Sequence, residues 1–283
     1  MTWFIWILIS IVMTAGSNLL QRVIMGKKDS DPFSTMLIFQ MLTTLMTGLF
    51  ALSQGFVVPE PGAPYFWNML LSGIFWGVGS LTMFKAYQLL GASENAIISS
   101  FSTIVTIVTA MYFLSETLDI YKTLGIVLIL VSVLAISVKK GKLSFTKGTI
   151  YALLSTTCYG LGVTNDAFIL RSYDAVSYTP IAFFLPAVLL VALKPSVIRR
   201  LKRLKDLVFT KNIILLSFFY GAQGVTYYLA LQSGGNASQI APIFKANIVL
   251  TVLLAVLFLK ERENLLLKVL SAGLVTAGVL LIK

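Results

Sequence analysis

The sequence predicts an all-α integral membrane protein with ten transmembrane helices, arranged as two inverted five-helix repeats. Three observations predict this fold: few charged residues, long uncharged stretches, and an internal repeat. Of the 283 residues, 57% are hydrophobic and 12% are charged, whereas an ordinary soluble domain carries roughly 25% charged residues. This composition excludes an ordinary soluble domain of this length.

The uncharged stretches are long enough to cross a bilayer, which requires about 20 apolar residues in a helix. The first stretch has no basic segment before it and no small-residue cleavage site, so we expect it to remain as a helix and not to be removed as a signal peptide. The stretches without any charged side chain are Thr2–Gln21, Phe33–Pro59, Pro61–Phe84, Asn95–Ser115 and Ala175–Leu193.

Ten helices account for all the hydrophobic segments. Because the bilayer core holds no water to pair with free amide groups, each span must be a hydrogen-bonded helix. The connections are short except for KPSVIRRLKRLKDLVFTK at residues 194–211. The predicted helices are residues 2–22, 33–54, 65–90, 93–115, 119–138, 148–170, 175–193, 211–232, 237–259 and 265–282.

An internal repeat relates the two halves of the chain, residues 1–140 and 148–283. GVGSLTMFKAYQLLGASENA, from Gly77, matches GAQGVTYYLALQSGGNASQIA, from Gly221, with one inserted residue. The match continues to Glu116 and Glu261, at the ends of the fourth and ninth helices. A repeat with an odd number of helices places its second copy upside down, so we expect a two-fold axis in the membrane plane and a site between the repeats.

The charge of the connections predicts the orientation. Connections after the odd-numbered helices hold 17 of the 22 lysines and arginines, which explains the net charge of +11. By the positive-inside rule this basic side faces the cytoplasm, so both termini are predicted on the non-cytoplasmic side of the cell (inner) membrane. Anionic lipid is the expected partner of these charges, and nucleic acid is not.

Two segments carry a resemblance to a known family. They are FKAYQLLGASENAIISSFSTIVTIVTAMYFLSETL and ALQSGGNASQIAPIFKANIVLTVLLAVLFLKERE, joined by AGSN at residues 15–18 and by the aliphatic helices after Lys122 and Lys268. On these motifs the sequence resembles the drug/metabolite transporter superfamily, specifically the ten-helix EamA-type permeases. Members usually keep both termini in the cytoplasm and have a basic loop after the second helix. Here that loop, SQGFVVPEPGAPYF, has no lysine or arginine.

Ionisable residues inside the predicted helices are the first candidates for a substrate site, because a charge at mid-bilayer needs a partner or a wet cavity. Lys245 is the deepest, and we expect it to face a central cavity. It either contacts a substrate carboxylate or phosphate, or pairs with Asp166 at similar depth. Lys85 is close enough to a helix end to extend to the headgroups. Glu94 fits a helix-start carboxylate better than a proton-coupling group.

Polar and aromatic side chains in the spans complete the predicted site, and Asp166 and Glu94 are the candidates for proton coupling. The predicted substrate-binding residues are Lys245, Asp166, Trp76, Tyr220, Gln223, Tyr227, Asn165 and Asn18; Gln40, Tyr159 and Asn247 are further possible pocket residues. No catalytic residue, metal site or cofactor is predicted. The chain has no histidine and one cysteine, Cys158, which removes histidine-based metal sites.

The resemblance implies a secondary active, alternating-access transporter of small polar metabolites such as amino acids, consistent with amino acid export. An alternative is exchange of anionic or phosphorylated metabolites. An intramembrane enzyme would need clustered aspartates or a nucleophile–base pair, and a passive channel would need a polar stripe along one pore; the sequence shows neither. We expect a small-molecule substrate, contact with membrane lipid, and a monomer or weak dimer.

Overall fold

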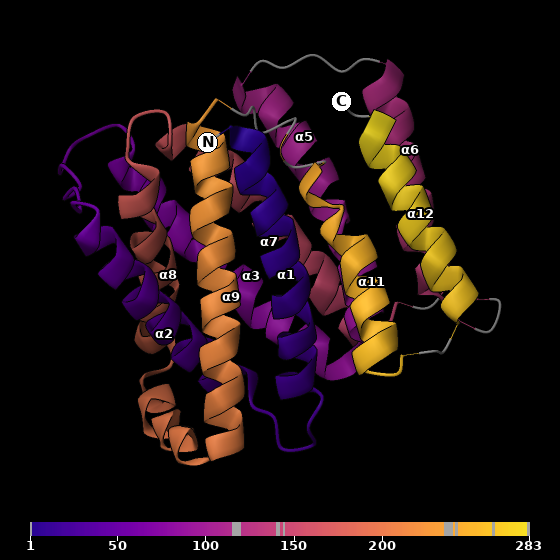
Figure 1. The fold of residues 1–283 in the computed structure, drawn as a ribbon, viewed down its shortest axis with the longest axis horizontal. Coiled ribbons are helices and arrows are strands. Elements are labelled where there is room, and N and C mark those ends of the chain that lie inside the picture. Colours follow the sequence, from indigo (N-terminus) through magenta and orange to yellow (C-terminus); the bar gives the residue numbers. More distant parts are fainter. Residues whose placement is uncertain are drawn as a thin grey trace.

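The computed structural model describes residues 2–114, 120–139, 142–143, 145–234, 240, 243–261 and 264–281. These residues form a bundle of helices that run roughly along one direction (Figure 1). The first half contains α1 (Trp3–Met25), α2 (Pro32–Ser53), α3 (Phe66–Leu89), α4 (Ala92–Ser99), α5 (Phe101–Leu114) and α6 (Ile120–Ser137). The second contains α7 (Lys147–Ile169), α8 (Ala175–Leu193), the 3₁₀ helix η1 (Pro195–Lys205), α9 (Leu207–Gln232), α11 (Asn247–Phe258) and α12 (Leu265–Leu281). Two short strands between the halves, β1 (Val138–Lys139) and β2 (Lys142–Leu143), pair in antiparallel register.

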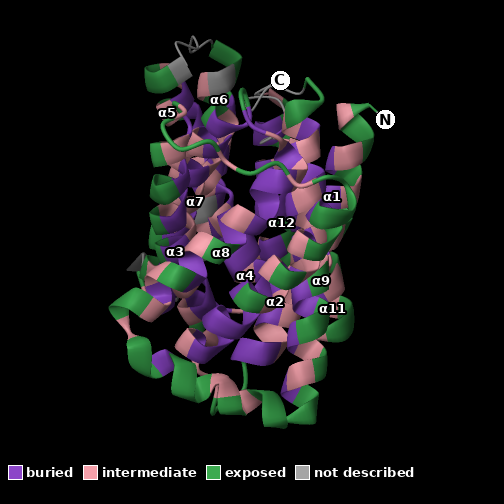
Figure 2. Cartoon of the chain, turned by 90° about the vertical axis from the view of Figure 1, so that its left-hand side faces the viewer, coloured by how far each residue is buried: buried purple, intermediate pink, exposed green. Residues whose placement is uncertain are grey.

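The surface of the bundle is that of a membrane protein. Six helical segments of the described chain are long and apolar enough to cross a bilayer, with α4 and α5 taken together as one of them. Large apolar side chains stand exposed on the outside, among them Leu49 at 61% on α2, Trp67 at 72% on α3 and Leu257 at 70% on α11. Figure 2 shows the exposed positions on the outer faces of the helices and the buried ones inside. Such an apolar exterior is stable against lipid and not against water. The protein is therefore a multi-pass membrane protein.

The two ends of the bundle differ in what they carry. The N- and C-termini lie at one end, and η1 lies at the other (Figure 1). Arg200 of η1 forms an ion pair with Asp31, and Arg203 donates to the hydroxyl of Ser34 and to the carbonyl of Asp29. The basic segment after α8 is thereby joined to the connection between α1 and α2.

The most extensive helix contacts join the two halves of the chain. The largest are α3 with α7, α1 with α9, α2 with α8, and α6 with α12. The order of the helices in the two halves matches α1 with α7, α2 with α8, α3 with α9 and α6 with α12. Under this correspondence, the contact of α3 with α7 is equivalent to the contact of α9 with α1. The contacts of α2 with α8 and of α6 with α12 each join two equivalent helices. The chain halves are therefore intertwined, and each helix near the centre packs against a partner from the other half.

Two helices predicted as continuous are broken in the structure. The helix expected at 93–115 is interrupted at Ser100, between α4 and α5. There the hydroxyls of Ser99 and Ser100 donate to carbonyls three residues earlier, at 2.6 Å each, which competes with the helical ladder. The helix expected at 237–259 has a turn at Lys245 and Ala246 before α11. Residues 235–239 and 241–242 of that helix lie outside the described residues.

The long connection predicted at 194–211 is shorter in the structure and mostly helical. Residues Pro195–Lys205 form η1, and α9 begins at Leu207, four residues earlier than expected. The start of α9 is set by Asp206, whose carboxylate accepts hydrogen bonds from the amides of Val208 and Phe209 at 2.9 and 3.1 Å. An aspartate at this N-cap position satisfies amide groups that have no partner within the helix.

Candidate functional site

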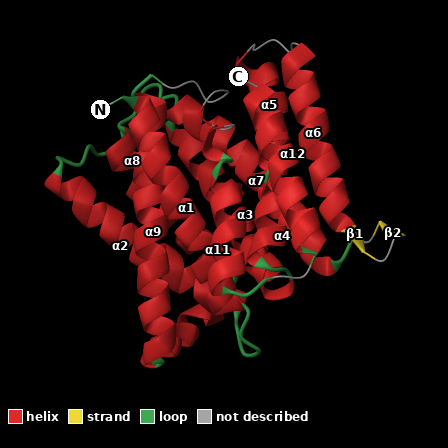
Figure 3. Cartoon of the chain, turned by 45° about the vertical axis from the view of Figure 1, so that its right-hand side comes forward, coloured by secondary structure: helices red, strands yellow, loops and turns green. Residues whose placement is uncertain are grey.

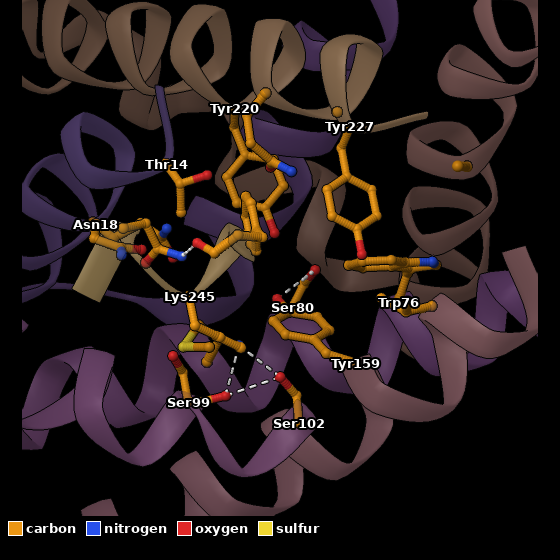
Figure 4. Close-up of a pocket in the computed structure, with 18 of the residues that line it drawn as sticks. Thr14, Asn18, Trp76, Ser80, Ser99, Ser102, Tyr159, Tyr220, Tyr227 and Lys245 are labelled. Atoms are coloured by element: carbon orange, nitrogen blue, oxygen red, sulfur yellow. Dashed lines mark hydrogen bonds between the residues drawn. The ribbon is translucent and has the colours of Figure 1, made fainter. Parts of the chain in front are cut away.

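A cavity of about 120 Å³ lies at the centre of the bundle, at the meeting point of both halves (Figure 4). A single water needs roughly 10–15 Å³ of such space, so the cavity has room for a small molecule. The lining residues come from α1, α2, α3, α4, α5, α7, α8, α9, α11 and the turn before α11. They are Thr14, Asn18, Gln21, Gln40, Trp76, Ser80, Met83, Tyr87, Ser99, Ser102, Thr103, Thr106, Tyr159, Val163, Ala182, Phe183, Tyr220, Gln223, Gly224, Tyr227, Tyr228, Phe244, Lys245 and Asn247.

Lys245 enters this cavity from the break that precedes α11. Its ammonium donates to the carbonyl oxygen of Ser99 at 2.9 Å and to the hydroxyl of Ser102 at 2.7 Å (Figure 4). The break at Ser100 makes this possible, because the last carbonyls of α4 have no partner within the helix. The C-terminal end of a helix also carries a partial negative charge, which stabilises a cation.

Among the described residues, no aspartate or glutamate lines the cavity. Lys245, 8% exposed, therefore brings a positive charge that the lining residues do not neutralise with a carboxylate. Among the residues that the structure describes, the ion pairs involve Glu261 and Asp31, and none joins Lys245 to Asp166. Lys245 thus lies among the aromatic and amide groups of the cavity, and its predicted contact with a substrate carboxylate or phosphate stays a prediction.

Asp166 lies behind the cavity, fully buried, and accepts four hydrogen bonds. Ser72 and Tyr178 donate to one carboxylate oxygen at 2.6 Å each. Trp76 and Tyr228 donate to the other at 2.8 and 2.7 Å. These donors belong to α3, α8 and α9, so one carboxylate of α7 connects four helices. Because Trp76 and Tyr228 also line the cavity, Asp166 fixes the position of two side chains in its wall.

Aromatic rings form much of the wall opposite Lys245. Trp76 and Tyr159 stack at 4.9 Å between ring centroids, with 37° between their planes. The ring of Tyr220 packs edge-on against Phe183, with centroids 5.8 Å apart. Tyr227 and Phe244 make a similar contact at 5.1 Å, which extends the aromatic surface toward the break before α11.

Some polar groups of the lining already form hydrogen bonds within the protein. Asn18 donates to the hydroxyl of Thr251 at 3.1 Å, and Gln40 donates to the hydroxyl of Ser80 at 3.2 Å. The side-chain oxygen of Gln40 and the hydroxyl of Thr103 are buried without a hydrogen bond in the described structure. Buried groups of this kind are costly unless a partner arrives, so a ligand with both donors and acceptors fits this surface.

The structure brings six of the eight predicted substrate residues into one cavity: Lys245, Trp76, Tyr220, Gln223, Tyr227 and Asn18. Gln40, Tyr159 and Asn247 line it as well. Asp166 and Asn165 do not, and Asn165 instead donates to the carbonyl of Asn68 and the hydroxyl of Ser72 at 2.8 and 2.6 Å. Glu94 lies in the first turn of α4 and is not among the lining residues.

Sequence reasoning missed the groups that hold the two buried charges. Ser99 and Ser102 bind Lys245, whereas Ser72, Tyr178 and Tyr228 bind Asp166. A single hydroxyl in an apolar helix gives no signal of its own, since serine and threonine often bond to their own helix. One signal was present for Tyr228: it adjoins Tyr227 in the repeat-related segment after Gly221.

The family model of the EamA-like transporter family matches the chain twice, over residues 1–138 and residues 146–283. One crystal structure, described only as that of a protein, superposes with a TM-score of 0.69 at 13% sequence identity, covering 98% of this chain and 94% of the other. At that identity the likeness concerns the fold alone. Comparison with curated proteins found no match.

Proposed function

Because the chain belongs to the EamA-like transporter family, we propose that it is an alternating-access secondary transporter whose central cavity binds small polar metabolites that carry a carboxylate. Lys245 is the anchor of that carboxylate. The observation that carries the proposal is its ammonium group, which lines the central cavity without a carboxylate among the described lining residues. An anionic substrate group supplies the missing charge, and ionic hydrogen bonds are the stronger ones.

Amino acids are the first candidates among such metabolites. The aromatic wall formed by Trp76, Tyr159, Tyr220 and Tyr227 suits the rest of an amino acid, since rings bind apolar side chains and attract an ammonium group through their faces. Asp166 is fully occupied by four donors, which makes it a poor partner for a substrate ammonium. Anionic or phosphorylated metabolites remain the alternative, because Lys245 donates hydrogen bonds to their anionic group and they carry no ammonium that needs an acceptor.

The same proposal includes two inverted five-helix repeats, residues 1–140 and 148–283. Three observations support it. The family model matches each half separately, the main interhelical contacts are exchanged between the halves, and the breaks at Ser100 and Lys245 fall at equivalent positions of the internal repeat. In such transporters, broken helices at the repeat interface present backbone groups to the substrate, as the carbonyl of Ser99 is presented to Lys245.

We further propose that the termini face away from the cytoplasm. The support is the basic character of the end that carries η1, because lysine and arginine in short loops are retained on the cytoplasmic side. A reporter that is active only in the cytoplasm, fused after the last residue, is expected to give no signal. A strong signal would reverse the orientation and leave the transport proposal intact.

The transport proposal is tested in proteoliposomes. Purified protein is reconstituted, loaded with one unlabelled amino acid or organic acid at a time, and exposed to a trace of the labelled compound outside. A carrier gives transient accumulation driven by exchange with the internal pool, and a channel gives none. A panel of carboxylates, their amides and phosphorylated compounds identifies the class. Exchange of the amides as fast as the carboxylates would exclude Lys245 as a carboxylate anchor.

A further inference from the structure

A second cavity, of about 740 Å³, lies on the outer flank of the bundle between α2 and α8. With one exception, Thr44, it is lined by apolar side chains. Met41, Leu45, Phe184 and Val188 in this lining are 44–58% exposed, so the cavity faces the membrane and not the interior. We call it the α2–α8 groove; its lining is Leu37, Ile38, Met41, Leu42, Thr44, Leu45, Phe184, Ala187, Val188, Val191, Ala192, Leu201 and Leu204.

One end of the groove is closed by η1, whose Leu201 and Leu204 belong to the lining. A 3₁₀ helix has three residues per turn, so residues three apart lie in one row along it. The row of Ile198, Leu201 and Leu204 is apolar, and Leu201 and Leu204 in it line the groove. The row of Val197, Arg200 and Arg203 faces the connection before α2, where Val197 is buried and both arginines are bonded.

The third row of η1 is Arg199, Lys202 and Lys205. All three side chains are exposed, and none has a hydrogen bond or ion pair within the described part of the chain. The row adjoins the apolar one. Three cations therefore stand together at the end of an apolar groove, at the end of the bundle opposite the termini (Figure 1).

The groove has the length of an acyl chain in one leaflet. On α2 its lining runs from Leu37 to Leu45, and on α8 from Ala192 to Phe184. At 1.5 Å per residue either side spans roughly 12 Å. One leaflet contributes about 15 Å of hydrocarbon. A lipid whose acyl chain fills the groove, with the tip of that chain at the end away from η1, would thus place its headgroup beside η1.

We propose that the α2–α8 groove is a binding site for one anionic phospholipid. An acyl chain lies between α2 and α8, and Arg199, Lys202 and Lys205 hold the phosphate and the anionic headgroup. Charge complementarity selects the lipid: a cluster of basic residues next to a membrane helix favours anionic headgroups, by roughly fivefold in affinity for each residue. The site is distinct from the central cavity, and it does not depend on which substrate is transported.

The test uses the full-length protein in detergent, mixed with phosphatidylglycerol or phosphatidylcholine, and counts bound lipids by native mass spectrometry. We expect one phosphatidylglycerol to be retained at activation energies that remove phosphatidylcholine. The triple variant Arg199→Gln, Lys202→Gln, Lys205→Gln should weaken that binding by on the order of a hundredfold. Ala192→Trp, which fills the groove at an exposed position, should remove both lipids.

Two matched variants control for charge and for bulk. Lys139→Gln, Lys142→Gln, Lys147→Gln removes the same charge at β1, β2 and the start of α7; the two strands lie on the opposite flank from α2 (Figure 3). Leu270→Trp adds an indole at an exposed site of α12. Both should bind phosphatidylglycerol as the unaltered protein does, and all variants must elute as single species. Equal retention of the two lipids, or an unchanged triple variant, would overturn the proposal. A dimer mass abolished by Ala192→Trp would show that a second copy covers the groove instead.

Discussion

The ammonium of Lys245 lies 2.9 Å from the carbonyl oxygen of Ser99, the last residue of α4. This contact joins the two halves of the chain across the central cavity. Ser102 donates its hydroxyl to the same carbonyl oxygen at 2.9 Å. The carbonyl therefore keeps a donor when the lysine is removed, and Lys245 is not required to satisfy it. The lysine is available for a substrate at low structural cost.

Lys245→Met should strongly weaken substrate binding while the protein still folds. The change keeps the length of the side chain and removes its charge. A hydrogen bond to a charged group contributes about 1.5–3 kcal/mol, so the Kd should rise by roughly 10- to 150-fold. Thermal unfolding with and without substrate measures this effect, because a ligand stabilises the folded state only in proportion to its binding.

Lys85→Met is the matched control for the same loss of charge. Lys85 contacts the rings of Phe33 and Tyr151 at 5.4 and 5.1 Å and does not line the cavity, so its variant should bind substrate normally. Because Lys245 and Asp166 form no ion pair, adding Asp166→Asn to Lys245→Met should not restore stability. Recovery in that double variant would mean that the two residues balance each other's charge. Transport unchanged in Lys245→Met would exclude the lysine from substrate binding.

Asp166→Asn should destabilise the fold, and its main effect should not be on the cavity, because Asp166 is not a lining residue. The amide group of asparagine has a donor in place of one acceptor oxygen. That donor then faces two of the four donors that bind Asp166, which are Ser72, Trp76, Tyr178 and Tyr228. An unsatisfied buried polar group costs about 1–3 kcal/mol, so we expect a loss of roughly 2–4 kcal/mol. Denaturant unfolding in detergent measures it. Asp174→Asn, at the N-cap of α8, keeps an acceptor and should stay within about 0.5 kcal/mol of the unaltered protein. An equally stable Asp166→Asn would contradict a structural role.

The sequence predicted the membrane helices well because the bilayer imposes one strong rule on every span. From length and apolar character, the ends of α1, α2, α3 and α8 were predicted to within three residues. The breaks at Ser100 and Lys245 were missed, since they depend on local serine hydrogen bonds and on packing between halves. The arrangement of η1 was missed as well, because its basic and apolar side chains separate into rows only when the segment forms a helix with three residues per turn.

The candidate site was predicted in part for a similar reason. An ionisable residue inside a span stands out in a sequence, so Lys245 and Asp166 were both selected. Depth along the chain could not decide whether they face each other. That depends on the side of each helix they occupy, and on hydroxyl groups from distant helices, such as Tyr178 for Asp166 and Ser102 for Lys245.

Glu261→Ala should loosen the contact between the end of α11 and the start of α4. The carboxylate of Glu261 accepts hydrogen bonds from the amides of Ala92 and Ser93 at 2.8 and 3.2 Å, and lies 3.6 Å from the ammonium of Lys268. Removing such a cap costs about 0.5–2 kcal/mol, so the melting temperature should fall. Gly91→Ala should act in the same direction, because a Cβ there would lie 2.7 Å from Glu261.

Thermal unfolding of these two variants is compared with that of Glu60→Ala. Glu60 is exposed in the connection between α2 and α3, so its removal should leave the melting temperature unchanged. Glu261→Gln retains one acceptor oxygen and should fall between Glu261→Ala and the unaltered protein. A melting temperature for Glu261→Ala equal to that of Glu60→Ala would show that the cap on α4 contributes nothing to stability.

The ion pair of Asp31 with Arg200 should make stability depend on acid pH. Partial burial raises the pKa of Asp31, but the hydrogen bond and the charge of Arg200 outweigh it and hold the pKa below its usual value. A carboxyl group whose pKa is lowered by folding stabilises the protein above its unfolded pKa, about 3.9, and loses that contribution as the pH falls through the folded pKa. The difference in stability between the unaltered protein and Asp31→Asn should therefore be constant near neutral pH. It should shrink below about pH 4.

The asparagine of Asp31→Asn keeps an N-cap acceptor for the amide of Phe33, so the comparison isolates the effect of the charge. We expect that effect to be about 1 kcal/mol or less, because Arg200 is 44% exposed. Melting curves from pH 7 to pH 3 measure the difference, and one that grows as the pH falls would contradict the pairing.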